Sequence, residues 1–204
     1  MEVIEKFIKG KFGKEELCED AIVVSENFIA VIDGVTSQEN YCKGKALGKI
    51  ISDILKNIIP VIPEENSCEE AINYLNKKIL EKYKKEGIYD LIKEDPRKQP
   101  EASVVIYSKY YNQIWMIGDC KALYGNNTID NELEIDIMYA KDVSEIAFCT
   151  DGYRKIFATL NECETYNKFI KENDPLGYKE YSYERGFVKN QENYDDRAYI
   201  RFKI

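Results

Sequence analysis

The segment CEDAIVVSENFIAVIDG, residues 18–34, consists of two apolar runs on either side of a short polar break. This pattern is typical of a β-hairpin with a two-residue turn at Glu26 and Asn27. The ladder that follows from this turn places Asp20 directly opposite Asp33. Directly opposed residues on one face have Cβ atoms about 4.5–5.5 Å apart, and like charges so placed repel each other. The hairpin therefore predicts a cation between its open ends, unless both acids are solvated strand ends, where aspartate is common.

Acidic residues also lie at one end of three other apolar runs. These are 115–119 with Asp119, 148–152 with Asp151, and 195–200 with Asp195. Together with the hairpin, four strand-end regions carry acids. This recurrence favours one shared site over a set of separate solvated turns.

Length and composition indicate a single domain over residues 1–204. With 44% hydrophobic residues, the chain is long enough for one proper core and too short for two. A net charge of −8 disfavours nucleic acids and anionic membranes as partners, because the field of the protein repels polyanions. No signal-peptide pattern opens the sequence, and no run approaches the ~20 apolar residues of a membrane span. We therefore expect a cytoplasmic protein.

The sequence contains no histidine. This excludes Ser-His-Asp and Cys-His catalysis and histidine-ligated zinc. Its six cysteines have no Cys-x-x-Cys spacing, which fits reduced thiols rather than a disulfide framework or a zinc knuckle. The chemistry that remains is that of carboxylates, whose hard oxygen ligands suit Mg²⁺ or Mn²⁺.

Apolar periodicity predicts the secondary structure. Helices are expected from Thr36 to before Pro60, from Ser67 to about Gly87, and from Tyr153 to about Ile170. The first two begin with a capping box, formed by Thr36 with Glu39 and by Ser67 with Glu70. Besides the hairpin, the expected strands are 3–8, 102–108, 113–117, 122–124, 135–139, 145–150 and 198–204. Antiparallel strands with helices in a pair and near the end indicate the α+β class.

The acidic motifs follow one another in a recognisable order. They are Glu19-Asp20-Ala21, Ile32-Asp33-Gly34, Ile117-Gly118-Asp119-Cys120, Thr150-Asp151-Gly152, and Asp195-Asp196 before the last strand. This order resembles that of the metal-dependent protein phosphatases (the type 2C, or PPM, family), and it spans most of the chain. The resemblance implies two packed antiparallel β-sheets flanked by helices, an α/β/β/α sandwich, with a metal site at one end. It also implies a metal-dependent phosphomonoester hydrolase that acts on protein phosphoserine or phosphothreonine, or on a small phosphomonoester.

The resemblance further implies a role for each motif residue around two Mn²⁺ or Mg²⁺ ions. Asp33 would bridge the ions, Gly34 (through its carbonyl), Asp20 and Glu19 would serve one ion partly through water, Asp151 and Asp195 would serve the other, and Asp119 would help to hold a third, weaker ion. Asp33 and Asp151 are the expected catalytic residues. The ions would lower the pKa of a bridging water that attacks phosphorus, and would neutralise charge on the phosphoryl group.

Two departures from the family pattern leave a second interpretation open. The position of the phosphate-binding arginine that precedes the Glu-Asp pair holds Glu15, and the family's histidine is also missing. Lys11, Lys14 or the distant Arg185 could replace the arginine, although a lysine cannot form the bidentate fork of a guanidinium on phosphate. The alternatives are therefore a catalytically silent phosphatase-like module that binds a phosphoprotein or partner, and a protein of this fold without metal.

Overall fold

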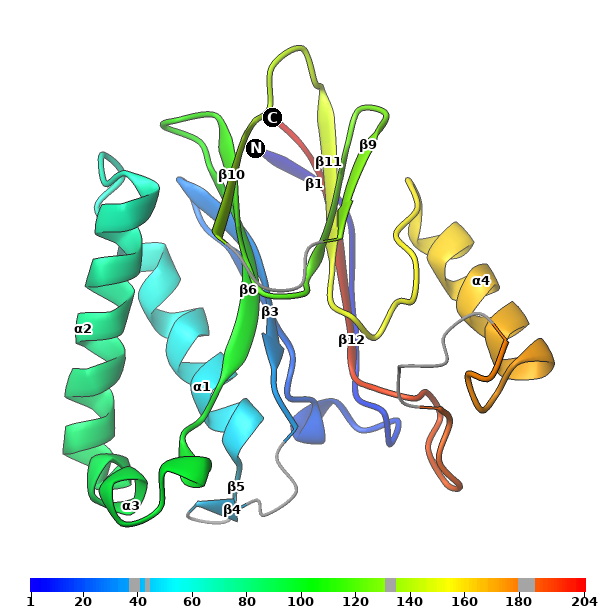
Figure 1. The fold of residues 1–204 in the computed structure, drawn as a ribbon. Coiled ribbons are helices and arrows are strands. Elements are labelled where there is room, and N and C mark those ends of the chain that lie inside the picture. Colours follow the sequence, from blue (N-terminus) through cyan, green and yellow to red (C-terminus); the bar gives the residue numbers. More distant parts are fainter. Residues whose placement is uncertain (37–40, 43–44, 131–134, 180–185) are drawn as a thin grey trace.

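The computed structural model describes residues 1–36, 41–42, 45–130, 135–179 and 186–204. This part of the chain forms two five-stranded antiparallel β-sheets that pack face to face, with α-helices on both outer sides (Figure 1). The predicted α+β sandwich of two antiparallel sheets is therefore confirmed.

The strand orders of the two sheets are β1-β12-β11-β8-β9 and β10-β7-β6-β3-β2. The first sheet contains β1 (Glu2–Lys9), β12 (Arg197–Lys203), β11 (Glu145–Cys149), β8 (Lys121–Tyr124) and β9 (Asn127–Asp130). The second contains β10 (Ile135–Tyr139), β7 (Gln113–Ile117), β6 (Ala102–Ser108), β3 (Phe28–Gly34) and β2 (Ala21–Val24). A small ribbon of β4 (Tyr41–Cys42) and β5 (Lys45–Ala46) precedes the first helix.

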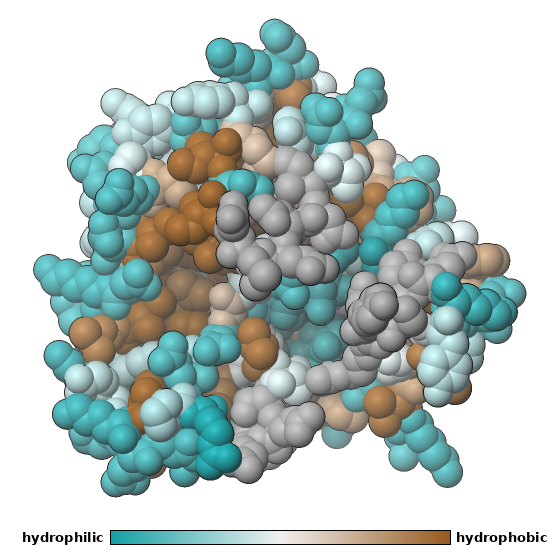
Figure 2. All heavy atoms as spheres, in the orientation of Figure 1, coloured by the Kyte–Doolittle hydropathy of each residue, from teal (hydrophilic) through white to brown (hydrophobic). Residues whose placement is uncertain are grey.

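The helices are divided between the two outer faces. The second sheet is covered by α1 (Leu47–Ile58), α2 (Cys68–Glu86) and α3 (Ile88–Glu94), and the first by α4 (Leu160–Asn173) (Figure 1). Polar side chains cover the outer surface of α2, while apolar side chains gather in a hollow between α2 and the sheets (Figure 2). Within the described ranges, none of the helices combines the length and the apolar character that crossing a lipid bilayer requires.

Strand β3 lies between β6 and β2 in the second sheet and is buried on both faces. Ala30 and Ile32 belong to the core between the second sheet and its helices. Ile29 and Val31 belong to the core between the two sheets. Because alternate side chains of a strand point to opposite faces, a strand buried on both sides must be apolar throughout. This explains the unbroken apolar run that ends at Asp33.

The predicted register of the central hairpin is confirmed. Ala21 pairs with Ile32, and the Ser25 amide donates to the carbonyl of Phe28 at 2.9 Å. One step beyond Ala21 and Ile32, the same register places Asp20 opposite Asp33. The second predicted hairpin, 102–108 with 113–117, is also confirmed.

Two predicted helix starts are wrong. The first helix begins at Leu47, not after Thr36, because the Thr36 hydroxyl binds Glu19 instead of capping a helix; Glu39, the other half of that capping box, lies outside the described residues. The last helix begins at Leu160, because Thr159 forms the capping box and Tyr153 packs in the core.

Other predictions of secondary structure were correct or incomplete. Ser67 and Glu70 form the predicted capping box of α2, which ends at Gly87 with φ 72°. The sequence analysis missed α3, because this seven-residue helix follows Gly87 directly and has no side-chain cap. It also missed β9, a four-residue edge strand whose polar residues do not alternate with apolar ones.

Candidate active site

The predicted acids meet at one end of the sandwich, where β3 ends and β12 begins (lower end in Figure 1). The Asp151 amide donates to Asp33 Oδ2 at 3.3 Å, which joins the end of the first sheet to the end of the second. Thr150 strengthens this junction, because its hydroxyl donates to Asp20 Oδ2 at 2.8 Å and accepts from the Ala198 amide at 2.9 Å. The strand-end acids thus come from both sheets and face one another.

The carboxylates of this cluster repel each other, and their pKa values reflect it. Burial first, and then the charge of Asp151, raise the pKa of Asp33 well above its usual value. Burial and the charge of Asp196 do the same for Asp20, although a hydrogen bond from Thr150 opposes the shift. Burial and then the charge of Asp195 raise the pKa of Asp151 to about 6.

Asp119 and Asp195 belong to the same cluster. The charge of Asp119 contributes to the raised pKa values of both Asp33 and Asp151. The charge of Asp195 acts on Asp20 and on Asp151. The structure therefore brings the predicted acids of the four strand-end regions close enough for their charges to act on one another.

Asp196 fastens the loop that precedes β2 to the start of β12. Its Oδ1 accepts from the Lys11 amide at 2.7 Å, and its Oδ2 accepts from the Glu19 amide at 2.6 Å. Asp196 is 2% exposed, so its carboxylate serves as the hydrogen-bond acceptor for two backbone amides in a place where water does not. In the sequence, Asp196 is only the second residue of the Asp195-Asp196 motif, and this positioning role is visible only in the structure.

Lys11 places its ammonium group inside the acid cluster. Its Nζ lies 2.9 Å from Asp195 Oδ1, 3.4 Å from Glu19 Oε2 and 3.9 Å from Asp196 Oδ2. Burial by itself would lower the pKa of this ammonium, but the attraction of Asp195, Asp196 and Glu19 outweighs it and holds the pKa above the usual value. Lys11 is therefore a buried positive charge next to the predicted metal ligands.

Thr36, which the sequence pattern assigned to a helix cap, belongs to the cluster instead. Its hydroxyl donates to Glu19 Oε2 at 2.8 Å and accepts from Lys11 Nζ at 2.6 Å. The only sequence signal for this role is that Thr36 is the first hydroxyl after Asp33-Gly34.

Gly34 is the point where the hairpin meets α1. A Cβ atom on Gly34 would lie 2.6 Å from the Glu19 carbonyl oxygen, and one on Gly48 would lie 2.6 Å from the Gly34 carbonyl oxygen and 2.7 Å from Glu19 Oε1. Any side chain at Gly34 or Gly48 would push α1 away from the hairpin. The two glycines therefore hold the Gly34 carbonyl and Glu19 close together.

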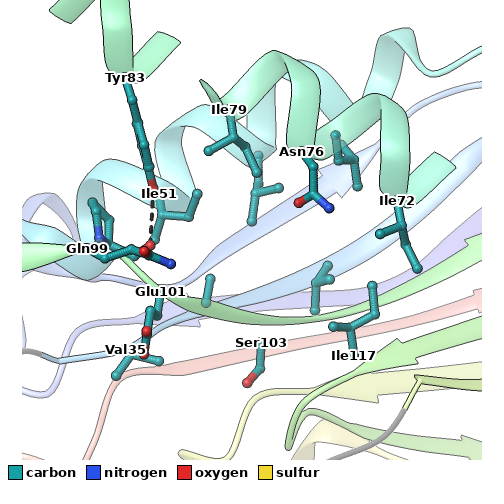
Figure 3. Close-up of a pocket in the computed structure, with 15 residues that line it drawn as sticks. Val35, Ile51, Ile72, Asn76, Ile79, Tyr83, Gln99, Glu101, Ser103 and Ile117 are labelled. Carbon is teal, nitrogen blue, oxygen red and sulfur yellow. Dashed lines mark hydrogen bonds between the residues drawn. The ribbon is translucent and has the colours of Figure 1, made fainter. Parts of the chain in front are cut away.

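A cavity of about 480 Å³ lies between α1, α2 and the second sheet (Figure 3), and the described residues that line it include none of the predicted acids. Val35, which follows Gly34, and Ser103, which pairs with Asp33, lie on its wall. Its other wall is formed by apolar residues of the helices, such as Ile51 and Ile79.

Solved structures with the same architecture identify the fold. The chain matches RsbX in complex with magnesium (14% identity, 98% of each chain covered, TM-score 0.54). It matches the Mycobacterium tuberculosis serine/threonine phosphatase PstP/Ppp (10%, 98% of each chain, TM-score 0.55) and Stp1 of Staphylococcus aureus (12%, 98% of this chain and 94% of that chain, TM-score 0.52). The fold is that of the PP2C-type serine/threonine phosphatases. Neither a protein-family model nor a curated protein matches the sequence.

The donor atoms of the acid cluster are of the kind that a hard divalent cation prefers. Every donor is an oxygen, and Glu19 Oε1 is a buried carboxylate oxygen with no hydrogen-bond partner in the described part of the chain. In the same part of the chain, no three histidine, cysteine or acidic side chains are already set as a metal-binding group. The ligand assignments for Glu19, Asp20, Asp33, Gly34, Asp119, Asp151 and Asp195 therefore stay predictions.

Two further basic residues of this PP2C-type end of the sandwich escaped the sequence analysis. The charge of Lys121, at the start of β8, lowers the pKa of Asp151, which places this lysine near the cluster. The Arg154 guanidinium stacks 3.7 Å from the ring centre of Tyr194, whose hydroxyl donates to the carbonyl of Asp151. Of the basic residues considered from sequence, Lys14 is exposed and Arg185 lies outside the described residues.

Proposed function

We propose that the protein is a metal-dependent phosphomonoester hydrolase that removes phosphate from phosphoserine or phosphothreonine in proteins. The observation that carries the proposal is the cluster of the buried Asp20 with the partly buried Asp33, Asp151 and Asp195 at the end of a PP2C-type sandwich. Like charges gathered in this way are costly, and a bound cation is what relieves the repulsion.

In this proposal the acids hold Mg²⁺ or Mn²⁺ and orient the attacking water. The charges of both Asp151 and Asp20 act on Asp33, which supports its proposed role as a metal ligand. The ions would supply Lewis acidity, lowering the pKa of water and neutralising charge on the phosphoryl group. RsbX, which shares the fold, is described in complex with magnesium, and this supports the choice of metal.

Among the residues that the structure describes, we assign no general acid to the leaving group. Histidine is absent from the sequence, and the proton of the Thr36 hydroxyl is already donated to Glu19. General acid catalysis typically contributes about 10²–10⁴-fold, so turnover of alkyl phosphates is expected to be slow.

The test is release of phosphate from phosphoserine and phosphothreonine peptides with Mn²⁺ and with chelator. Asp33→Asn should abolish Mn²⁺-dependent release, while Asp90→Asn, an exposed acid on α3, should leave it unchanged. No release by the wild-type protein at millimolar Mn²⁺ would refute the proposal.

A silent phosphatase-like module is the second candidate. It is favoured by Glu15 at the position of the family's arginine and by Lys11, whose ammonium lies among the acids rather than free to bind phosphate. Binding of a phosphopeptide without any release of phosphate would support this alternative.

A further inference from the structure

Lys11 is held in the acid cluster from both its main chain and its side chain. Its amide donates to Asp196 Oδ1, and its carbonyl accepts from the Glu192 amide at 2.7 Å. These bonds tie Lys11 to the segment that leads into β12, 181 or more residues away in the chain. The position of its ammonium is therefore set by the fold and not by a mobile side chain on the surface.

The ammonium group has an acceptor for each of its three protons. The acceptors are Thr36 Oγ1 at 2.6 Å, Asp195 Oδ1 at 2.9 Å and Glu19 Oε2 at 3.4 Å. A lysine ammonium has three donors and no more. Lys11 therefore cannot hold a substrate phosphate unless it gives up one of these partners, and its side chain, 6% exposed, is already enclosed.

Lys11 divides the cluster into two halves. Glu19, Asp195 and Asp196 lie within 4 Å of its Nζ and share its positive charge. Asp33 and Asp151 form the other half, and no contact with Lys11 joins them to its charge within the described residues. In the part of the chain that the structure describes, Asp33 and Asp151 have no ion pair comparable to those of Lys11, although the charge of Lys121 acts on Asp151.

A divalent ion on the Lys11 side would compete with the ammonium. An ion that used Asp195 Oδ1 at a typical distance of about 2.1 Å would lie within about 5 Å of Lys11 Nζ, since that nitrogen is 2.9 Å from the same oxygen. Two positive charges at such a distance in a buried site repel strongly. A carboxylate oxygen that binds a divalent ion would therefore lose its hydrogen bond from the ammonium, or bind the ion less tightly.

We propose that Lys11 is a built-in cation that takes the place of one divalent ion, so that the protein binds one Mn²⁺ or Mg²⁺, at Asp33 and Asp151, and not a pair. This inference rests on the metal site of the proposed function. It makes Lys11 a residue that sets metal stoichiometry and not a ligand for phosphate.

The test compares Mn²⁺ binding by the wild-type protein, Lys11→Met and Lys14→Met, by equilibrium dialysis and electron paramagnetic resonance. Lys14 is the matched control, because it is exposed and lies on the same loop. We expect one Mn²⁺ per chain with a mononuclear spectrum for the wild type and Lys14→Met. Lys11→Met should bind two ions with an exchange-coupled spectrum, and Mn²⁺ should raise its melting temperature more than that of the wild type.

Two ions with a coupled spectrum in the wild type, or one ion in both the wild type and Lys11→Met, would overturn the inference and leave the proposed function standing. No bound Mn²⁺ in any of the three proteins would refute the metal site itself and the inference with it. If Lys11→Met does not fold, as judged by circular dichroism, the wild-type stoichiometry decides alone.

Discussion

Replacing Asp196 by alanine should strongly destabilise the protein. The carboxylate accepts from the buried amides of Lys11 and Glu19 at 2.7 and 2.6 Å, and the substitution leaves both without an acceptor. An unsatisfied buried donor costs about 1–3 kcal/mol, so two cost about 2–6 kcal/mol. Removing the carboxylate also relieves its burial and its repulsion from Asp195, although it loses the attraction of Lys11.

We therefore expect Asp196→Ala to lower the free energy of unfolding by about 2–4 kcal/mol. With a urea m-value of about 2 kcal/mol/M, the midpoint of unfolding should fall by about 1–2 M at an unchanged m-value. Asp196→Asn keeps one acceptor oxygen and should lie between the wild type and the alanine variant. The exposed Asp90→Ala serves as the control and should change stability by no more than about 0.5 kcal/mol.

The measurement is urea unfolding followed by circular dichroism and by the fluorescence of Trp115, the single tryptophan of the chain. A loss below about 1 kcal/mol for Asp196→Ala would refute the reasoning, because it would mean that neither amide depends on the carboxylate. A changed m-value would instead point to a partly unfolded native state, with the Lys11 loop released.

Four other outcomes are expected. Millimolar Mn²⁺ should raise the melting temperature through binding to the folded state, and Asp33→Asn should lose most of that shift in a thermal scan. In chelator, the free energy of unfolding should fall as the pH rises from about 4 through 6 and above. The reason is that the pKa values of Asp20, Asp33 and Asp151 are raised in the folded state, so the folded protein binds more protons than the unfolded chain. A higher stability at pH 7 than at pH 5 in urea titrations would contradict this. Gly48→Ala should destabilise the folded protein, although alanine gains up to about 1 kcal/mol in helix propensity over glycine, because the new Cβ would lie 2.6 Å from the backbone of Gly34. An unchanged urea midpoint would exclude this close approach. Turnover of aryl phosphates should depend steeply on leaving-group acidity and exceed that of phosphoserine peptides, and a flat dependence across substituted phenyl phosphates would reveal an unidentified proton donor.

Local patterns predicted most of the fold. The register of the central hairpin followed from its two-residue turn, since turn length fixes which residues face each other. The same register predicts that Asp20 lies opposite Asp33. The start of α4 was predicted wrongly, because the apolar spacing continues on the N-terminal side of Thr159 and does not show which residue caps the helix.

The contents of the site could be predicted only in part, because its bonds join distant parts of the chain. Lys11 and Asp195 are 184 residues apart, and Asp196 binds amides 177 and 185 residues away. A motif can show that a residue is acidic and lies at a strand end. It cannot show that a lysine near the N-terminus reaches the start of the last strand, nor that the Thr36 hydroxyl accepts a hydrogen bond from this lysine.

The contacts of Lys11 affect both the stability of the metal-free fold and its affinity for divalent cations. A cluster of buried carboxylates destabilises the metal-free fold, and an internal ammonium offsets part of that cost without any ion from solution. Each carboxylate oxygen that accepts from Lys11 is, however, less available to a divalent cation. A chain that stabilises its acids with a lysine therefore gives up some affinity for metal, as expected where a residue that supports folding lies inside a functional site. Removing the ammonium should therefore lower the stability of the metal-free protein and also increase the stabilisation that Mn²⁺ provides. Both effects arise from the same carboxylate oxygens of Asp195 and Glu19.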